Sequence, residues 1–209
     1  MNEISKYISL KQYVPIGTPE ISNFELKSEE IKIENTDEVM VLNEFISVDP
    51  YMRARMTEKK NYKDPFKIGK AMDGLAIGKV IQTNSNNFNV GDIVSSNFGW
   101  RDKYVTSEKN IKKIINQDIP LSAYLGPLGM TGHTAYIGLF KIGKIKENQT
   151  VLVSSAGGSV GSTVCQIAKM MNCKVIASTG SDKKVDWLKN ELNVDHAFNY
   201  KKIDNLVLY

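Results

Sequence analysis

The stretch that decides the fold is Val151–Gly161, which reads Val-Leu-Val-Ser-Ser-Ala-Gly-Gly-Ser-Val-Gly. Its first five residues form a short apolar run, which predicts a strand buried on both faces. Apolar residues then recur at spacings of three and four through residue 171, which predicts a helix over 158–171. A small-residue turn between such a strand and such a helix is typical of a dinucleotide-binding β-α-β unit.

The turn fits the pattern G-x-G-x-x-G with Ala156 in the place of the first glycine. We expect residue 156 to permit the tight turn, Gly158 to let a pyrophosphate approach the backbone, and Gly161 to let the helix pack close to the sheet. The start of the helix would offer unpaired N–H groups and its positive dipole end to the phosphates. The alternative is a purely structural turn, which the flanking strand and helix disfavour.

The chain continues with two further strands and a helix between them. We predict strands over 174–178 and 196–200, and a helix capped by Ser181 or Asp182. This β-α-β-α-β series is one half of a doubly wound Rossmann sheet, with strand order 3-2-1. The outer edge of the first strand would then be unpaired, so we expect either a fragment of a longer reading frame or a partner that covers the edge.

The end of the second strand indicates which dinucleotide is bound. An NAD site would place Asp or Glu there, but this chain has Ser178-Thr179-Gly180-Ser181, followed by Asp182-Lys183-Lys184. A hydroxyl group and a lysine attract a 2′-phosphate, so NADP is favoured over NAD. The alternative is that Lys183 and Lys184 form only the solvated start of a helix.

The N-terminal part has a different pattern. Residues 1 to about 120 contain short β-like runs at 38–48, 74–83 and 93–96, and glycines in the second run indicate a bulge or a sharp bend. Residues 121–140 are expected to form helices broken by tight turns. The fold class is therefore a β domain followed by an α/β domain.

Composition excludes several classes of protein. The chain has 209 residues, 42% of them hydrophobic, and a net charge of +4. No run of Lys and Arg exceeds two residues, so we expect no nucleic-acid tract. No apolar stretch is long enough to predict a membrane span, and the start lacks the pattern of a signal peptide, so a cytoplasmic location is expected by default.

Metal binding is not expected. Two cysteines, Cys165 and Cys173, and two histidines, His133 and His196, do not supply the ligands of a structural or catalytic zinc site. We predict that both cysteines are buried core residues and that both histidines are structural rather than catalytic.

Six stretches of the chain form a recognisable series. They are Ser47–Arg53 (Ser-Val-Asp-Pro-Tyr-Met-Arg), Gly91–Val94, Leu125–Tyr136 (Leu-Gly-Pro-Leu-Gly-Met-Thr-Gly-His-Thr-Ala-Tyr), Val153–Gly161, Gly180–Lys184 and Phe198–Tyr200. In order and spacing they resemble the zinc-free medium-chain dehydrogenase/reductase superfamily, and within it the NADP-dependent alkenal, prostaglandin and curcumin double-bond reductases.

The resemblance implies a GroES-like substrate domain over 1–120 and a partial NADP-binding Rossmann domain over 121–209, which includes the domain junction. It also implies a homodimer for the full-length protein. The cofactor-binding residues that it implies are Gly158, Ser159, Val160 and Gly161, Lys184 and Tyr200 at the 2′-phosphate, and Met130 and Thr134 near the cofactor at the domain junction.

The function implied is NADPH-dependent reduction of the C=C bond of α,β-unsaturated ketones and aldehydes. Hydride addition at the β-carbon leaves charge on the carbonyl oxygen, and Tyr51 is the best candidate to donate a hydrogen bond to it. Tyr51 could instead be a packed aromatic with its hydroxyl at the surface. Two other functions stay open, a quinone reductase and a non-catalytic nucleotide-binding or interaction module.

Overall fold

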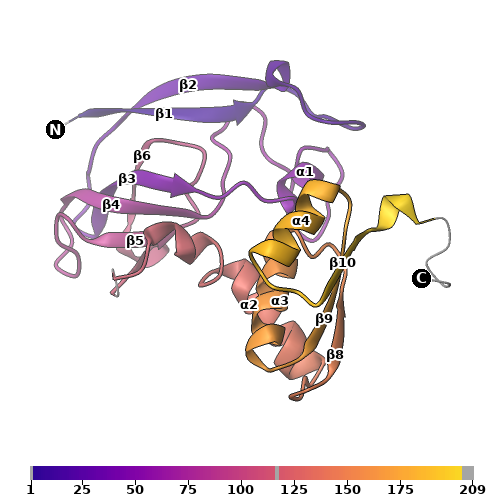
Figure 1. The fold of residues 1–209 in the computed structure, drawn as a ribbon. Coiled ribbons are helices and arrows are strands. Elements are labelled where there is room, and N and C mark those ends of the chain that lie inside the picture. The colour runs from indigo at the N-terminus through magenta and orange to yellow at the C-terminus, as the bar shows by residue number, and fades with distance from the viewer. Residues whose placement is uncertain (1, 116–117, 204–209) are drawn as a thin grey trace. The chain divides into compact units, whose positions relative to one another are not determined.

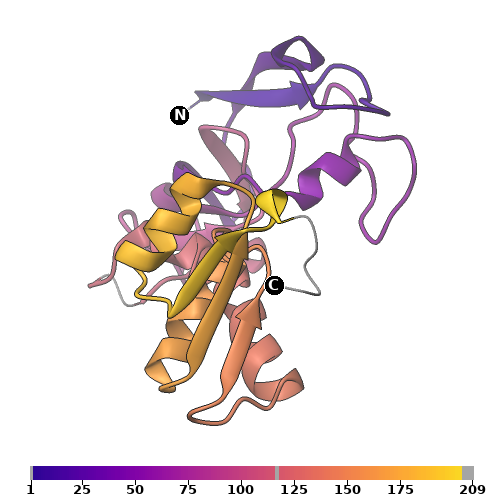
Figure 2. The same cartoon turned by 45° about the vertical axis from the view of Figure 1, so that its right-hand side comes forward.

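The computed structural model describes residues 2–115 and 118–203. The chain divides into two compact units, Met1–Leu125 and Gly126–Tyr209, and each is described by itself (Figures 1 and 2). Among the described residues, no helix is long and apolar enough to cross a membrane.

Unit 1 is built on antiparallel sheets. A five-stranded sheet has the order β6-β3-β4-β5-β7, and β1 pairs with β2 in a separate two-stranded sheet. The strands are β1 (Glu3–Leu10), β2 (Phe24–Ile31), β3 (Glu38–Ile46), β4 (Ala76–Thr83), β5 (Ile93–Ser96), β6 (Lys103–Ser107) and β7 (Lys112–Lys113). Short helical segments are η1 (Ile21–Asn23), α1 (Tyr51–Arg55), η2 (Glu108–Asn110) and η3 (Leu121–Leu125).

The three predicted β runs are confirmed as β3, β4 and β5. The expected irregularity is also present, because the pairing of β3 with β4 shifts register between Met40 and Val41 and again between Asn43 and Phe45. Gly78 lies opposite Asn43, and a Cβ atom on it would lie 2.6 Å from the carbonyl oxygen of Leu42. The glycine therefore permits a close approach of the two strands at the irregularity.

Unit 2 contains the predicted half of a doubly wound sheet. Its three parallel strands have the order β10-β9-β8, which confirms the expected order 3-2-1. The elements are α2 (Met130–Tyr136), η4 (Ile137–Ile142, a π-helix), β8 (Thr150–Val153), α3 (Ser159–Met170), β9 (Lys174–Thr179), α4 (Asp182–Asn190), β10 (His196–Asn199) and η5 (Tyr200–Lys202). The cap of α4 is Ser181, whose hydroxyl accepts from the N–H of Lys184.

The prediction that the first strand of this unit is buried on both faces is wrong. Val153 is 5% exposed, but its neighbour Leu152 is 68% exposed. Cys165 of α3 and Leu188 of α4 belong to one core cluster with Val153. Both helices therefore pack on the same face of the sheet, and Leu152 points to the other face because successive strand residues alternate.

Candidate functional site

The conformation of the turn after β8 is fixed by backbone hydrogen bonds and by one residue in the left-handed region. Ser155 has a φ of +49°, so the left-handed residue comes one position before Ala156. Ala156 is fully buried, and its N–H donates to the carbonyl of Ser178 at the end of β9 at 2.9 Å. Gly158 closes the turn by donating its N–H to the carbonyl of Ser155 at 2.9 Å.

Two of the glycines allow close contacts within the turn. A Cβ atom on Gly161 would lie 2.5 Å from the carbonyl oxygen of Ser155 and 2.8 Å from the Cα of Ala156. Gly161 was predicted to let the helix pack close to the sheet. The close contact that it allows is between α3 and the turn residues Ser155 and Ala156. At Gly158 a Cβ atom would lie 3.2 Å from the same oxygen of Ser155.

The start of α3 offers hydrogen-bond donors. Its N-cap is Gly158, which has no side chain to cap the helix. Within the described part of the chain, the N–H groups of Ser159, Val160 and Gly161 have no acceptor, since the first donation along the helix is from Ser162 to Gly158. These groups, together with the positive end of the helix dipole, suit the phosphates of a dinucleotide.

Lys184 lies against this turn. A Cβ atom on Gly157 would lie 2.8 Å from Cδ of Lys184 and 3.1 Å from Oγ1 of Thr179. Gly157 therefore makes room for the aliphatic part of the lysine, a role that the sequence alone does not reveal. Lys184 lies in the first turn of α4, which begins directly after the carboxyl end of β9.

Tyr200 lies at the same end of the sheet. Asn199 pairs with Thr179, so Tyr200 and Gly180 follow side by side after β10 and β9. A Cβ atom on Gly180 would lie 3.4 Å from the hydroxyl oxygen of Tyr200 and 3.3 Å from Cε of Lys201. Sequence reasoning missed Lys201, although the pair of lysines directly after Asn-Tyr was a visible signal.

The remaining two residues of the expected cofactor set lie on α2. The hydroxyl of Thr134 donates to the carbonyl of Met130 at 2.8 Å, and Met130 is 44% exposed. Thr134 lines a cavity of about 440 Å³ with Val160 and Gly161, whereas Met130 does not line it. The residues that line this cavity are Thr134, Ala135, Gly138, Leu139, Val151, Leu152, Val153, Ser154, Ser155, Val160, Gly161 and Val164.

Tyr51 lies in unit 1 as the first residue of α1, a short helix within the loop that connects β3 to β4. Two arginines of this helix hold that part of the loop in place. Arg53 donates from Nε and Nη2 to the carbonyl of Gly17, at 3.1 and 2.9 Å. Arg55 is 8% exposed, donates to the carbonyl of Asp64 at 2.8 Å, and forms a two-pronged ion pair with Asp73. Its guanidinium also lies 4.0 Å from the centre of the Phe66 ring.

The phenol of Tyr51 is half-buried and stays protonated at neutral pH. Burial raises its pKa above the ordinary value, and the negative charge of Asp49 adds to the rise. The side chain packs against the edge of the hydrophobic cluster that contains Met52. Nζ of Lys63 lies 5.0 Å from the centre of the Tyr51 ring. A protonated phenol is a hydrogen-bond donor, as the expected role requires.

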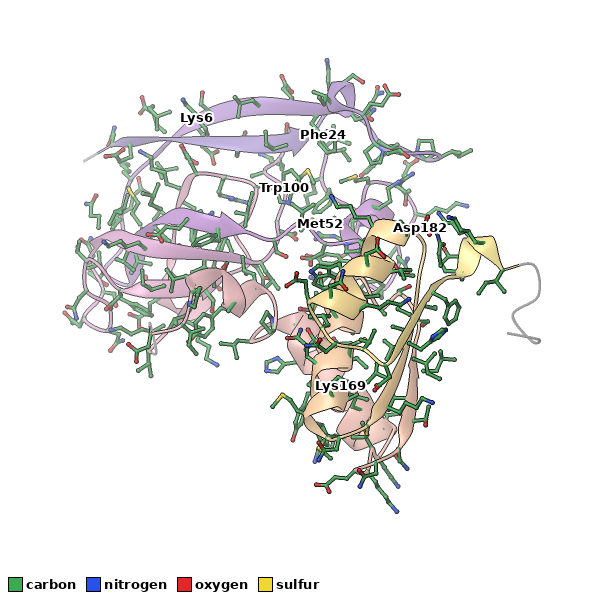
Figure 3. All side chains as sticks on the ribbon, viewed as in Figure 1. Lys6, Phe24, Met52, Trp100, Lys169 and Asp182 are labelled. Carbon is green, nitrogen blue, oxygen red and sulfur yellow. The ribbon has the colours of Figure 1, made fainter. Side chains whose placement is uncertain are left out.

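A cavity of about 460 Å³ lies beside this loop, and Pro50 and Met52 line it although Tyr51 does not. Figure 3 shows three of its lining residues, Phe24, Met52 and Trp100. The residues that line it are Gly17, Thr18, Pro19, Phe24, Val48, Asp49, Pro50, Met52, Arg53, Met56 and Trp100.

The two cysteines are not reactive groups of the site. Cys165 and Cys173 are both buried and free, as predicted, and burial raises the pKa of Cys165 to about 11. A thiol with that pKa is protonated at neutral pH and is a poor nucleophile. Among the described residues, no three His, Cys, Asp or Glu side chains form a group that could hold a metal ion.

Comparison with known protein families agrees with this architecture. Residues 6–114 match a family described as "N-terminal domain of oxidoreductase", and residues 159–207 match a family described as "Zinc-binding dehydrogenase". The first match covers more than half of the chain. The chain belongs to the medium-chain dehydrogenase/reductase superfamily. Unit 1 is its GroES-like β domain and unit 2 is the first half of its Rossmann domain.

Individual members of the superfamily are similar over most of this chain. The 2-alkenal reductase (NADP(+)-dependent) of Nicotiana tabacum is 41% identical over 97% of the chain and 60% of its own length. Prostaglandin reductase 1 of Rattus norvegicus is 40% identical over 91% of the chain and 56% of its own length. The crystal structure of CurA from Vibrio vulnificus in complex with NADPH has a TM-score of 0.86 at 34% identity, covering 95% of this chain and 59% of that one.

The chain thus spans between 56% and 60% of the length of these relatives.

Proposed function

We propose that this chain is part or all of an NADPH-dependent oxidoreductase that reduces the C=C bond of α,β-unsaturated aldehydes and ketones. Residues 1–120 would hold the substrate and residues 121–209 the NADP. One observation carries the proposal. Lys184 and Tyr200 both lie at the carboxyl ends of β9 and β10, where Gly157 and Gly180 have no side chains that would occupy the same space. The reaction class is inferred from the similarity to the 2-alkenal reductase and to prostaglandin reductase 1.

The residues of unit 2 suit NADP in kind and in place. The N–H groups of Ser159, Val160 and Gly161 would bind the pyrophosphate, with Gly158 leaving the approach open. Lys184 and Tyr200 would bind the 2′-phosphate. Thr134 would line the cofactor site beside Val160, and Met130 would lie near it. Bound NADPH supplies the hydride in this class of reaction.

Tyr51 is the proposed hydrogen-bond donor to the carbonyl oxygen of the substrate. Its raised pKa keeps the proton on the hydroxyl at neutral pH, and Arg53 and Arg55 restrain the loop that carries it. A donor held in a fixed position stabilises the charge that develops on the oxygen at little cost in reorganisation. Pro50 and Met52 line the neighbouring cavity, which would therefore suit an apolar chain of the substrate.

The experiment that tests the reaction class measures NADPH oxidation by the purified protein with a 2-alkenal, an enone and a quinone in parallel. We expect turnover with the first two, with the saturated aldehyde and the saturated ketone as the respective products. Quinone turnover alone would favour the quinone reductase instead. Nucleotide binding without turnover on any substrate would favour the non-catalytic module.

The same proposal includes three further expectations. We expect a small-molecule substrate rather than nucleic acid or a membrane, a cytoplasmic location, and a homodimer for the full-length protein. Sedimentation of the full-length protein tests the dimer, and a monomer at micromolar concentration would contradict it.

A further inference from the structure

Two lysines follow Tyr200 at the end of β10, and they differ in what they contact. Nζ of Lys202 donates to Oδ2 of Asp182 at 2.6 Å. The amide of Asn199 donates to the other oxygen, Oδ1, at 2.9 Å. Asp182, labelled in Figure 3 at the start of α4, therefore has both carboxylate oxygens occupied and its charge matched by Lys202.

Among the described residues, Lys201 has no such partner. Within residues 2–115 and 118–203 neither Lys201 nor Lys184 forms an ion pair. Cε of Lys201 and the hydroxyl of Tyr200 lie 3.3 and 3.4 Å from the position that a Cβ atom on Gly180 would take. The ammonium group is one bond beyond Cε, so it and the tyrosine hydroxyl flank the same point of the backbone.

The local structure keeps the two lysines apart. Tyr200–Lys202 form the single 3-10 turn η5, in which successive residues are turned by about 120° from one another. Asn199 fixes this turn, because its Oδ1 accepts from the N–H of Lys201 at 3.2 Å while its amide binds Asp182. Lys202 is thereby directed to the carboxylate and Lys201 to Gly180.

We propose that Lys201 is a specificity-determining residue that binds the 2′-phosphate of NADP together with Lys184 and Tyr200. The proposal rests on the proposed function, since it adds a third donor to the same site. A phosphate monoester carries close to two negative charges and three acceptor oxygens, so two ammonium groups and one hydroxyl match it in charge and number. Gly157 and Gly180 leave space for the three side chains around Thr179.

The test compares binding of 2′,5′-ADP and 5′-AMP to the 209-residue chain by titration calorimetry, since the two probes differ only in the 2′-phosphate. Lys201→Met should weaken 2′,5′-ADP binding by about fivefold to tenfold and leave 5′-AMP within about twofold. Lys201→Arg should retain most of the affinity. Lys189→Met, which removes an equal charge at the far end of α4, should change neither value by more than about twofold at physiological salt.

Unchanged 2′,5′-ADP binding in Lys201→Met would overturn the proposal, as would an equal loss in Lys189→Met, which would indicate a general charge effect. If Lys184→Met loses 2′,5′-ADP binding while Lys201→Met does not, the proposed cofactor site stands and only the role of Lys201 fails. If the unsubstituted chain binds the two probes equally or binds neither, the proposed NADP site fails and the role of Lys201 fails with it.

Discussion

The turn at 154–161 and the loop at 49–55 are held in place by different means. The turn presents backbone N–H groups, and Gly161 keeps α3 against it through a contact that any side chain would obstruct. The loop presents one side chain, Tyr51, and other side chains hold the loop, above all Arg55 with Asp73. A site built from backbone needs glycines at fixed spacing, whereas a site built from side chains needs partners that are distant in sequence.

The largest effect should come from breaking the turn. Gly161→Ala would place a Cβ atom 2.5 Å from the carbonyl oxygen of Ser155, which the backbone cannot avoid without moving α3. We expect a loss of about 2 to 3 kcal/mol in the free energy of unfolding, measured by urea titration, and loss of 2′,5′-ADP binding. The control for stability is Gly138→Ala, because a Cβ atom there meets nothing within 4 Å. A Gly161→Ala protein as stable as that control would contradict the account of the turn.

A smaller effect should come from breaking the loop. Arg55→Met removes an ion pair and a contact with Phe66 from a side chain that is 8% exposed. We expect a loss of about 2 kcal/mol, less than for a fully buried pair because the Asp73 side chain is 46% exposed. Lys60→Met is the matched control, since its pair with Asp64 is exposed on both sides. Weakened 2′,5′-ADP binding in folded Arg55→Met would show that the two regions are not independent.

Tyr51→Phe should separate chemistry from binding. Loss of the hydroxyl removes a donor to the substrate oxygen, so turnover of a 2-alkenal should fall by about tenfold while affinity for NADPH is unchanged. Tyr62→Phe is the control, because Tyr62 is 73% exposed. Equal turnover in the two variants would remove Tyr51 from the proposed role.

The smallest effect concerns Asp195, which connects the end of α3 to the start of β9, at the end of the sheet opposite the turn. Its carboxylate accepts from the N–H of Val175 at 2.6 Å and from Nζ of Lys169 at 3.0 Å. The bond from Val175 lowers the pKa of Asp195 below its ordinary value of 3.8, and the bond from Lys169 adds to this. The carboxylate thus adds stability that is complete well above pH 3.8 and is lost as the pH falls through the lower pKa of the folded state.

Urea titration of the protein and of Asp195→Asn at several pH values measures this contribution. We expect a difference of about 0.5 to 1 kcal/mol at pH 7, reduced by solvent screening because the pair is partly exposed, and a smaller difference below pH 3.8. A difference that does not change with pH would contradict the assignment to the ionised carboxylate.

Features that depend on local sequence, such as the turn, could be predicted, whereas contacts between distant residues, such as those of the loop, could not. Strand order, the helix at 159–170 and the cap at Ser181 follow from local spacing and residue type, and all were predictable. Gly157 was not assigned a role, because its need for space arises from Lys184 on another element. Arg55 was missed since its partner Asp73 is 18 residues away. The burial of Leu152 was predicted wrongly, because an apolar run does not show which faces of a strand are covered.

We propose that unit 2 binds NADP through the turn and the carboxyl ends of β9 and β10. A crystal structure of the chain with NADP⁺ bound tests it most directly. We expect the pyrophosphate at the N–H groups of Ser159 to Gly161, and the 2′-phosphate within hydrogen-bonding distance of Lys184, Tyr200 and Lys201. A nucleotide bound elsewhere, or a 2′-phosphate that contacts none of these three side chains, would contradict it.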